Sequence, residues 1–317
     1  MSYRIGSFNM FKFQAYRSDD NIKKDIAKIA EIIRTEKFDI VALQEIFSET
    51  AMRILLKYLG PSWDGRWEQP YYASSSAAEG YAFIWNKMRF KLAATSLDDG
   101  NIRVAEPHVF YQYKLDRTKW QEKLIRDPYY GRFTPLALPK CEFRLINAHI
   151  MFSRNSQHSE DNPLGDVRMR RNEHSILAEA LYPKIADKVY GNNCVGYTIL
   201  LGDYNLNHPE SSAYGAWLQE EFIIQDGRAI KRIKTVQTDL TTLRTPSEDP
   251  EEVDDGQIWA NNYDHFSYDA NRFEGKGIGM KSSRVNSVVY CSDYKEHRKI
   301  ISDHVPIKLD VELRGNK

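Results

Sequence analysis

The chain has 317 residues, of which 44 are Lys or Arg and 44 are Asp or Glu, so its formal net charge is zero. Because 42% of the residues are hydrophobic and 28% are charged, the chain can bury a sizeable core and is not a disordered polymer. A protein that holds nucleic acid by bulk electrostatics usually has a basic excess, which this composition excludes. The length fits either two domains or one large α/β domain.

Short apolar runs alternate with helical patterns along the chain. A first strand is expected to end at Asn9, and isoleucines spaced three and four apart predict a helix over 22–33 that Ser18 or Asp19 would cap. A further helix is expected over 166–181. Further strands are expected at 38–45, 81–85, 143–150, 197–203, 285–292 and 305–313. This alternation indicates an α/β fold.

The cysteines and the N-terminal residues indicate the cellular compartment in which the protein works. Cys141, Cys194 and Cys291 are an odd number without a C-x-x-C pair, which argues against a disulfide framework and against a zinc–thiolate site. The N-terminus lacks the apolar stretch of a signal peptide, and no run approaches the roughly 18 apolar residues of a membrane span. We therefore expect a cytoplasmic protein that does not contact a membrane, and its oligomeric state stays open.

Polar residues suited to chemistry stand at the ends of the predicted strands or in the turns beside them. They are Asn9, Glu45, His149, Asp203, Asn205, Asp264, Asp303 and His304. Neighbouring strands bring their ends together at one rim of a sheet, and α/β folds place their sites at that rim. The pattern therefore predicts one site built from distant parts of the chain.

These residue types suit metal-assisted acid–base chemistry. Glu45 and Asp303 supply carboxylates and Asn9 supplies a neutral carbonyl oxygen. Ligation by oxygen alone suits Mg²⁺, with Mn²⁺ as the alternative. His149 and His304 can serve as acid and base near neutral pH.

Further side chains complete a set that can hydrolyse a phosphoester. A carboxylate is available to orient each imidazole, with Asp264 a natural partner for one histidine and Glu79 for the other. Asp203 and Asn205, two residues apart in a strand-end turn, could address an attacking water and a phosphate oxygen. An activated water, a stabilised phosphate charge and a protonated leaving group are what phosphodiester hydrolysis requires.

Each residue taken alone also has a structural explanation. His149 fits a hydrogen-bonded strand histidine, Asp303 fits a turn before a strand, and Glu79 fits a solvated surface charge. The functional interpretation therefore depends on the ordered set.

The ordered set resembles the motifs of the endonuclease/exonuclease/phosphatase superfamily. The matching segments are Phe8-Asn9, Leu43-Gln44-Glu45, Asn147-Ala148-His149, Gly202-Asp203-Tyr204-Asn205, Tyr263-Asp264 and Ser302-Asp303-His304. Segments 79–83, 97–100 and 131–135 are similar to parts of deoxyribonuclease I. The resemblance implies an α/β fold of four layers, with two packed mixed β-sheets flanked by helices, as a single domain over 1–317.

The resemblance also implies roles. His304 held by Asp264 would activate or position the water, and His149 held by Glu79 would protonate the leaving oxygen. Glu45 would hold the metal ion with Asn9 and Asp303 close by. The residues implied at the scissile phosphate are Asp203, Asn205 and Arg132.

Several positions depart from deoxyribonuclease I. Phe47 stands where that enzyme has an arginine that enters the DNA minor groove, and Ala77-Ala78 replace a tyrosine and a lysine. The signatures of abasic-site endonucleases and of inositol-polyphosphate phosphatases are absent. The stretch 202–214 looks somewhat like that of deadenylases, which keeps RNA open as a substrate.

Three segments could influence substrate choice. An insertion at about 101–131 carries basic and aromatic residues up to Arg132, which suits contact with a nucleic-acid backbone and bases. A second basic run lies at 228–234. An acidic loop at about 245–256 carries six acids and no base. Solvated helices and surface loops are the alternative interpretation of these segments.

The sequence thus predicts a divalent-metal-dependent phosphodiester hydrolase, with a nuclease favoured and DNA preferred over RNA as the substrate. A phosphatase or phosphodiesterase for small-molecule or lipid phosphates is the first alternative. A non-catalytic binding protein on the same fold is the second.

Overall fold

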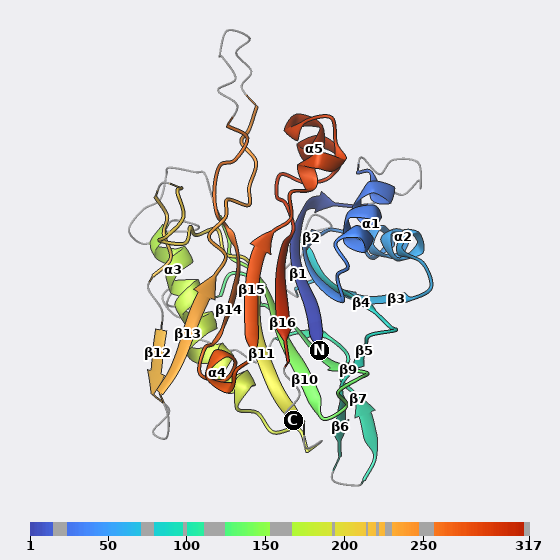
Figure 1. The fold of residues 1–317 in the computed structure, drawn as a ribbon, viewed down its shortest axis with the longest axis vertical. Coiled ribbons are helices and arrows are strands. Elements are labelled where there is room, and N and C mark those ends of the chain that lie inside the picture. The colour runs from blue at the N-terminus through green and yellow to red at the C-terminus, as the bar shows by residue number, and fades with distance from the viewer. Residues whose placement is uncertain are drawn as a thin grey trace.

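Two β-sheets are stacked face to face, and helices lie on the outer side of each sheet (Figure 1). The computed structural model describes residues 1–14, 24–70, 79–97, 100–110, 124–152, 167–191, 194–213, 215–219, 222–225, 230–246 and 257–313. Met1 and Leu313, the first and last described residues, lie together, and the N-terminal amine of Met1 donates to the carbonyl oxygen of Leu313 at 2.8 Å.

The first sheet has six strands in the order β15–β16–β1–β2–β4–β3. In chain order they are β1 (Ser2–Phe13), β2 (Ile40–Ile46), β3 (Trp63–Glu68), β4 (Gly80–Asn86), β15 (Gly279–Arg284) and β16 (Ile307–Glu312). Only β1 and β2 run parallel, and the other pairs are antiparallel. The carboxyl ends of β1 and β2 therefore lie together at one edge of the sheet.

The second sheet has eight strands, seven of them in the order β12–β13–β14–β11–β10–β9–β5, with β8 paired to β9. The strands are β5 (Phe90–Leu92), β8 (His108–Val109), β9 (Tyr129–Pro135), β10 (Cys141–His149), β11 (Val195–Asp203), β12 (Phe222–Gln225), β13 (Ile230–Val236) and β14 (Asp264–Asp269). Here β10 and β11 are the parallel pair, and His149 lies directly opposite Asp203. A separate hairpin is formed by β6 (Ala94–Ser96) and β7 (Ile102–Val104).

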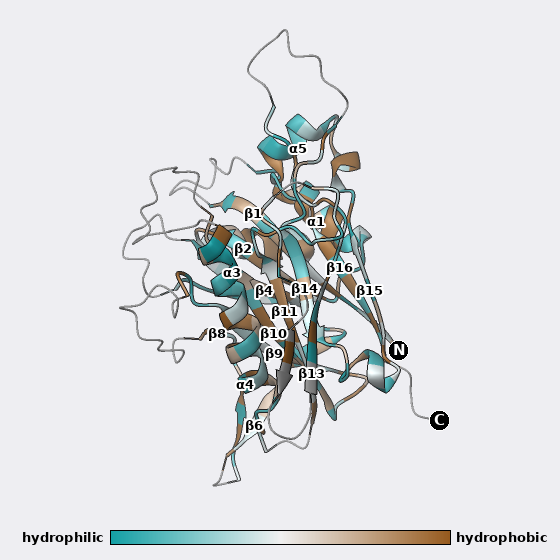
Figure 2. Cartoon of the chain, turned by 90° about the vertical axis from the view of Figure 1, so that its left-hand side faces the viewer, coloured by the Kyte–Doolittle hydropathy of each residue, from teal (hydrophilic) through white to brown (hydrophobic). Residues whose placement is uncertain are grey.

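Three apolar clusters separate four layers. One cluster fills the space between the sheets, where Phe83 stacks on Tyr129 with ring centroids 5.1 Å apart. A second lies between the first sheet and helices α1 (Ile26–Thr35) and α2 (Glu49–Leu59). Helix α3 (Val167–Ser175) continues into a π-helix (Ile176–Leu181) and α4 (Tyr182–Ala186), and the third cluster lies between these last two helices and the second sheet. Each buried aromatic contributes about 1.5–3 kcal/mol, and Figure 2 shows apolar residues concentrated on the central strands.

The four-layer α/β sandwich expected from the sequence is confirmed, together with most of its elements. The predicted strands at 38–45, 81–85, 143–150, 197–203 and 305–313 correspond to β2, β4, β10, β11 and β16. The first helix begins later than predicted, because Asp25 caps it by accepting a hydrogen bond from the Lys28 amide at 2.9 Å. The predicted caps Ser18 and Asp19 lie outside the described residues.

The predicted strand at 285–292 is wrong. Strand β15 already occupies the sheet edge beside β16, so the chain leaves the sheet after Arg284 and forms a short 3₁₀ helix at Ser287–Tyr290. Tyr290 and Cys291 then pack on the cluster beneath α1. The apolar run therefore serves helix packing and forms no strand pairs. Within the described residues, no helix is both long and apolar enough to cross a membrane.

Candidate active site

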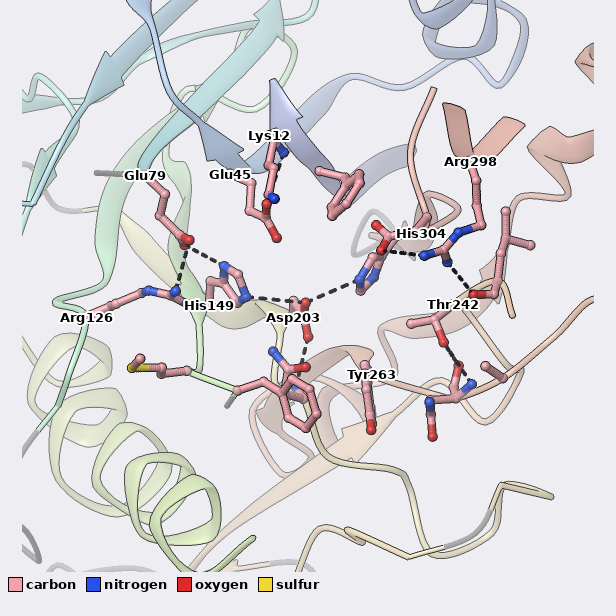
Figure 3. A pocket seen from close by; sticks show the side chains of 18 of the residues that line it. Lys12, Glu45, Glu79, Arg126, His149, Asp203, Thr242, Tyr263, Arg298 and His304 are labelled. Atoms are coloured by element: carbon pink, nitrogen blue, oxygen red, sulfur yellow. Dashed lines mark hydrogen bonds and ion pairs between the residues drawn. The ribbon is translucent and has the colours of Figure 1, made fainter. Parts of the chain in front are cut away.

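A pocket of about 950 Å³ opens where the carboxyl ends of both parallel strand pairs meet. Its walls carry carboxylates and two histidines, together with Lys12, Arg126 and Arg298 (Figure 3). Aromatic side chains also line it, namely Phe11, Phe47, Phe152 and Tyr263. Of the ten site residues proposed from the sequence, seven line this pocket directly: Glu45, Glu79, His149, Asp203, Asn205, Asp303 and His304.

Unusual backbone geometry directs side chains into the pocket. Glu45 has φ of 56° at the point where the β2 ladder shifts register against β1 and β4. Asn205 has φ of 50°, a conformation that asparagine tolerates better than most residues. At Gly202 φ is 141°, and a Cβ there would lie 1.8 Å from the carbonyl oxygen of Ala148. Such positions cost free energy and concentrate at functional sites.

Asn9 ties the two sheets together beneath the pocket. Its Nδ2 donates to Glu45 Oε1 at 3.1 Å and to Asp203 Oδ2 at 3.0 Å. Its Oδ1 accepts from the Phe11 amide at 2.9 Å. Asn9 therefore presents its donor side to both carboxylates, and its oxygen, which the sequence placed near a metal, is already hydrogen-bonded. Nearby, Gln44 from the first sheet donates to Asn147 Oδ1 of the second sheet at 2.6 Å.

His149 is oriented by Glu79. Its Nδ1 lies 2.5 Å from Glu79 Oε1, and its Nε2 lies 3.5 Å from Asp203 Oδ2. Burial lowers the pKa of His149, but the carboxylates of Glu79 and Asp203 together raise it, so the net pKa lies above its usual value. Burial raises the pKa of Glu79, whereas the charges of His149 and Arg126 lower it to below its usual value overall.

His304 has the same arrangement on the other side of the pocket. Its Nδ1 lies 2.8 Å from Asp264 Oδ2, and its Nε2 lies 3.6 Å from Asp203 Oδ2. Burial lowers the pKa of His304, but the carboxylates of Asp264 and Asp203 raise it to well above its usual value. The Ser302 hydroxyl fixes the turn by donating to the carbonyl oxygen of Asn9 at 2.7 Å.

Asp203 lies at the centre, between both imidazoles (Figure 3). Its Oδ1 accepts from the Asn205 amide at 2.9 Å, and the side chain is 1% exposed. Burial raises its pKa, and the two histidines only partly oppose this shift. Two imidazoles, each anchored at Nδ1 by a carboxylate, thus direct Nε2 toward one oxygen atom.

The donor set fits a hard divalent cation. Glu45 accepts from Asn9 and from the Lys12 amide at 3.0 Å, and its carboxylate lines the pocket. Asp303 also lines it, and its Oδ1 is buried without a hydrogen-bond partner. An orphaned carboxylate oxygen in a pocket that a second carboxylate also lines suits Mg²⁺ or Mn²⁺.

A second acidic group lies nearby. Asp203, Asp264 and His304 bring ligand-type atoms within 4.8 Å of one another. His304 Nδ1 already contacts Asp264 Oδ2, whereas His304 Nε2 lies 3.6 Å from Asp203 Oδ2.

The structure places Arg132, the remaining residue predicted to bind phosphate, outside the pocket. Strand β9 runs away from the site. Tyr129 pairs with Asn147 near the site, and Arg132, three residues further along β9, pairs with Arg144. Its guanidinium donates to buried Glu142 at 2.7 Å and lies 3.4 Å from the ring of Tyr190. Arg132 is therefore satisfied within the second sheet.

Two arginines that the sequence did not assign to the site stand at the pocket instead. Arg126 Nη2 lies 3.0 Å from Glu79 Oε2. Arg298 of helix α5 (Tyr294–Ile300) lies 3.5 Å from Asp303 and donates to the carbonyl oxygen of Leu243 at 2.6 Å. Arg126 belongs to the basic insertion, and Arg298 comes shortly before Asp303 in the chain. The nearness of each arginine to a segment that the sequence had singled out was the signal that could have identified it.

Some predicted features cannot be placed. Residues 111–123 of the basic insertion, Ala77-Ala78 and residues 247–256 of the acidic loop lie outside the described residues. The basic run at 228–234 is described only in part.

Comparison with known proteins agrees with the fold and identifies the family. A family model described as the Endonuclease/Exonuclease/phosphatase family matches residues 6–220. An endonuclease/exonuclease/phosphatase from Bacteroides vulgatus has a TM-score of 0.56 at 16% identity, covering 99% of this chain and 100% of that chain. No protein among the curated sequences matches the chain.

Two further solved structures share the fold. D. rerio TDP2, complexed with single-strand DNA product, has a TM-score of 0.57 at 14% identity, covering 98% of this chain and 99% of that chain. ANGEL2, a 2′,3′-cyclic phosphatase in complex with adenosine-2′,3′-vanadate, has a TM-score of 0.55 at 13% identity, covering 98% and 95%. Because the family model spans more than half of the sequence and the shared fold covers nearly all of it, the chain belongs to the endonuclease/exonuclease/phosphatase family.

Proposed function

We propose that the protein is a divalent-metal-dependent phosphodiester hydrolase that acts on nucleic acid. The observation that carries the proposal is the pair of histidines whose Nε2 atoms lie 3.5 and 3.6 Å from one oxygen of Asp203. Each histidine is fixed at Nδ1 by a carboxylate. This arrangement provides two proton-transfer groups on opposite sides of one small space, as in-line hydrolysis of a phosphodiester requires.

The proposed roles follow from the pKa shifts. His149, whose pKa is raised, keeps its proton to a higher pH than an ordinary histidine and donates it to the leaving oxygen. Asp203, whose pKa is also raised, accepts a proton from the attacking water more readily than an ordinary aspartate. His304 orients that water and, as an imidazolium, stabilises negative charge on the phosphate. Asn205 lines the pocket beside Asp203 and is placed to contact a phosphate oxygen.

Glu45 and Asp303 are the residues that would hold the cation, with Asn9 fixing the Glu45 carboxylate. When bound, Mg²⁺ or Mn²⁺ supplies Lewis-acid stabilisation of the phosphate charge.

The pocket lining favours a nucleotide strand over a bare phosphate. Its volume of about 950 Å³ far exceeds that of one phosphate group. Aromatic side chains beside arginines suit bases and backbone phosphates, respectively. The folds of TDP2, complexed with single-strand DNA product, and of ANGEL2, a 2′,3′-cyclic phosphatase, support this substrate class. We propose DNA as the first substrate to test, with RNA as the second.

The test is hydrolysis of single- and double-stranded DNA and RNA and of bis-p-nitrophenyl phosphate, with Mg²⁺ or Mn²⁺ and with EDTA. His149→Gln and His304→Gln should each reduce hydrolysis by about 10²–10⁴-fold. His108→Gln is the matched control, because His108 is exposed and does not line the pocket. Turnover of the small ester alone would favour a small-phosphate phosphodiesterase, and silence in every arm would favour a binding protein. Variants within tenfold of wild type would refute the proposed roles.

A further inference from the structure

A buried carboxyl group that the proposed mechanism does not use lies beside the pocket. Glu173 on helix α3 is 2% exposed. Its Oε1 accepts a hydrogen bond from the Ile125 amide at 2.6 Å. Ile125 and the next residue, Arg126, both line the pocket. Glu173 therefore anchors the segment that carries Arg126 to a helix of the outer layer.

Arg126 connects this carboxyl group to the proposed acid. Its Nη2 lies 3.0 Å from Glu79 Oε2, and Glu79 Oε1 lies 2.5 Å from His149 Nδ1 (Figure 3). The second nitrogen of the guanidinium, Nη1, is buried without a hydrogen-bond partner, and so is Oε2 of Glu173. Glu79 and Glu173 both act electrostatically on Arg126. One guanidinium is thus influenced by two carboxyl groups, only one of which contacts His149.

We propose that Glu173 is a positioning residue for His149. Glu173 acts through Arg126, by setting how strongly the guanidinium charge acts on the Glu79–His149 pair. The inference deepens the proposed function and rests on it for the role of His149 as acid. Its structural part, the coupling of Glu173 to His149, holds independently of any activity.

The physical basis is the position of Glu173 in a buried, weakly screened environment. Burial raises the pKa of Glu173 to about 7, although the Ile125 amide and Arg126 lower it. Among the described residues, the other groups that act on it are the Met151 amide and His149, while Glu173 itself acts on Tyr81 of β4. Glu173 therefore changes charge near neutral pH, next to the site.

The sign of the coupling follows from the charges. Arg126 lowers the pKa of His149. When Glu173 is ionised, it offsets the charge of Arg126 and favours the imidazolium form of His149. When Glu173 is protonated, Arg126 acts without that offset, and the pKa of His149 falls.

The direct test follows the ring nitrogens of His149 by NMR during a pH titration. Glu173→Gln keeps the size of the side chain and an acceptor for the Ile125 amide but removes the charge. We expect the pKa of His149 to fall by about 0.5–1 unit, whereas Arg126→Gln should raise it. Glu179→Gln is the matched control, because Glu179 follows in the adjoining π-helix and is exposed. In the wild type, the His149 signals should also show a second inflection where the Glu173 carboxyl titrates.

An unchanged His149 pKa in folded Glu173→Gln would overturn the proposal, even if the variant is less stable, because a purely structural role predicts that result. If the variant does not fold, a missing second inflection in the wild type would overturn it instead.

Hydrolysis supplies an independent readout. At pH 5.5 the Glu173 carboxyl group of the wild type is protonated and therefore uncharged, like glutamine, so the two rates should be equal. At pH 8.5 the rate of Glu173→Gln should be about 3- to 10-fold below that of wild type. The loss should appear in kcat and leave KM unchanged, because Glu173 does not line the pocket. A loss that is equal at both pH values would overturn the proposal. A wild type without any hydrolytic activity would refute the proposed function and leave the NMR test intact.

Discussion

Replacement of Asp203 by asparagine tests the central feature of the site. The carboxylate oxygen lies 3.5 Å from Nε2 of His149 and 3.6 Å from Nε2 of His304. At an effective dielectric constant of about 20, each charge pair at such a distance amounts to about 4 kcal/mol. This corresponds to about 3 pKa units for each imidazole. Because side chains relax and water enters when the charge is removed, we expect both pKa values to fall by about 1–3 units.

The same change should cost stability. Asp203 accepts hydrogen bonds from Asn9 and from the Asn205 amide on its two oxygens. Asparagine offers only one oxygen, so one buried donor loses its acceptor, at a cost of about 1–3 kcal/mol. Urea denaturation of both proteins would measure this difference.

The assay is an NMR pH titration of the histidine ring nitrogens, with two control variants. Glu79→Gln should lower the pKa of His149 alone, and Asp264→Asn should lower that of His304 alone, because each carboxylate contacts one ring. Asp203→Asn should lower both. If Asp203→Asn is folded and either imidazole keeps its pKa within about 0.3 unit, the electrostatic reasoning about this site is refuted.

Three further predictions concern the backbone and the buried histidines. Gly202→Ala should destabilise the protein by about 3 kcal/mol in urea denaturation, because its Cβ would lie 1.8 Å from the Ala148 oxygen; a loss below about 1 kcal/mol would contradict this. Glu45→Gly should relieve the backbone strain at φ of 56° and raise the free energy of unfolding by about 1 kcal/mol. Calorimetry should show that the same variant binds Mg²⁺ more weakly, and an unchanged Mg²⁺ affinity would argue against Glu45 as a ligand. Burial lowers the pKa of His174 from 6.5 to about 3 and that of His265 from 6.5 to about 4. Below pH 6.5 the unfolded chain therefore takes up protons that the folded protein does not, and stability should fall as the pH falls. His174→Gln should reduce that slope by about 1.36 kcal/mol per pH unit, and an unchanged slope would show that His174 is already charged in the fold.

Much of the site could be predicted from the sequence because it depends on strand ends. Apolar runs mark β2, β10 and β11, and the residue that follows such a run lies at an edge of the sheet. Parallel pairing of β10 with β11 then places His149 opposite Asp203. Local pattern and chain order were sufficient to predict that these residues come together.

The partners within the site were decided by tertiary structure. The residue types alone offered Glu79 and Asp264 to either histidine. The family resemblance implied Glu79 for His149 and Asp264 for His304, and the packing of the two sheets brings these pairs into contact. The two-sided role of Asn9 also depends on this packing, since Glu45 and Asp203 come from different sheets. Contacts between sheets have no counterpart in the order of residues along the chain.

The arginines show this limit most clearly. Arg132 and Arg126 lie in the same basic segment, six residues apart, and the sequence motif favoured Arg132. Strand β9 carries Arg132 away from the pocket and pairs it with Glu142, whereas Arg126 precedes the strand and is held at the pocket by Glu79. The sequence by itself determined the layered α/β fold and the rim where the polar residues gather, because apolar periodicity and strand ends are local properties. Only the tertiary structure decided which charges meet there, because strand direction, register and sheet packing set the distances between side chains.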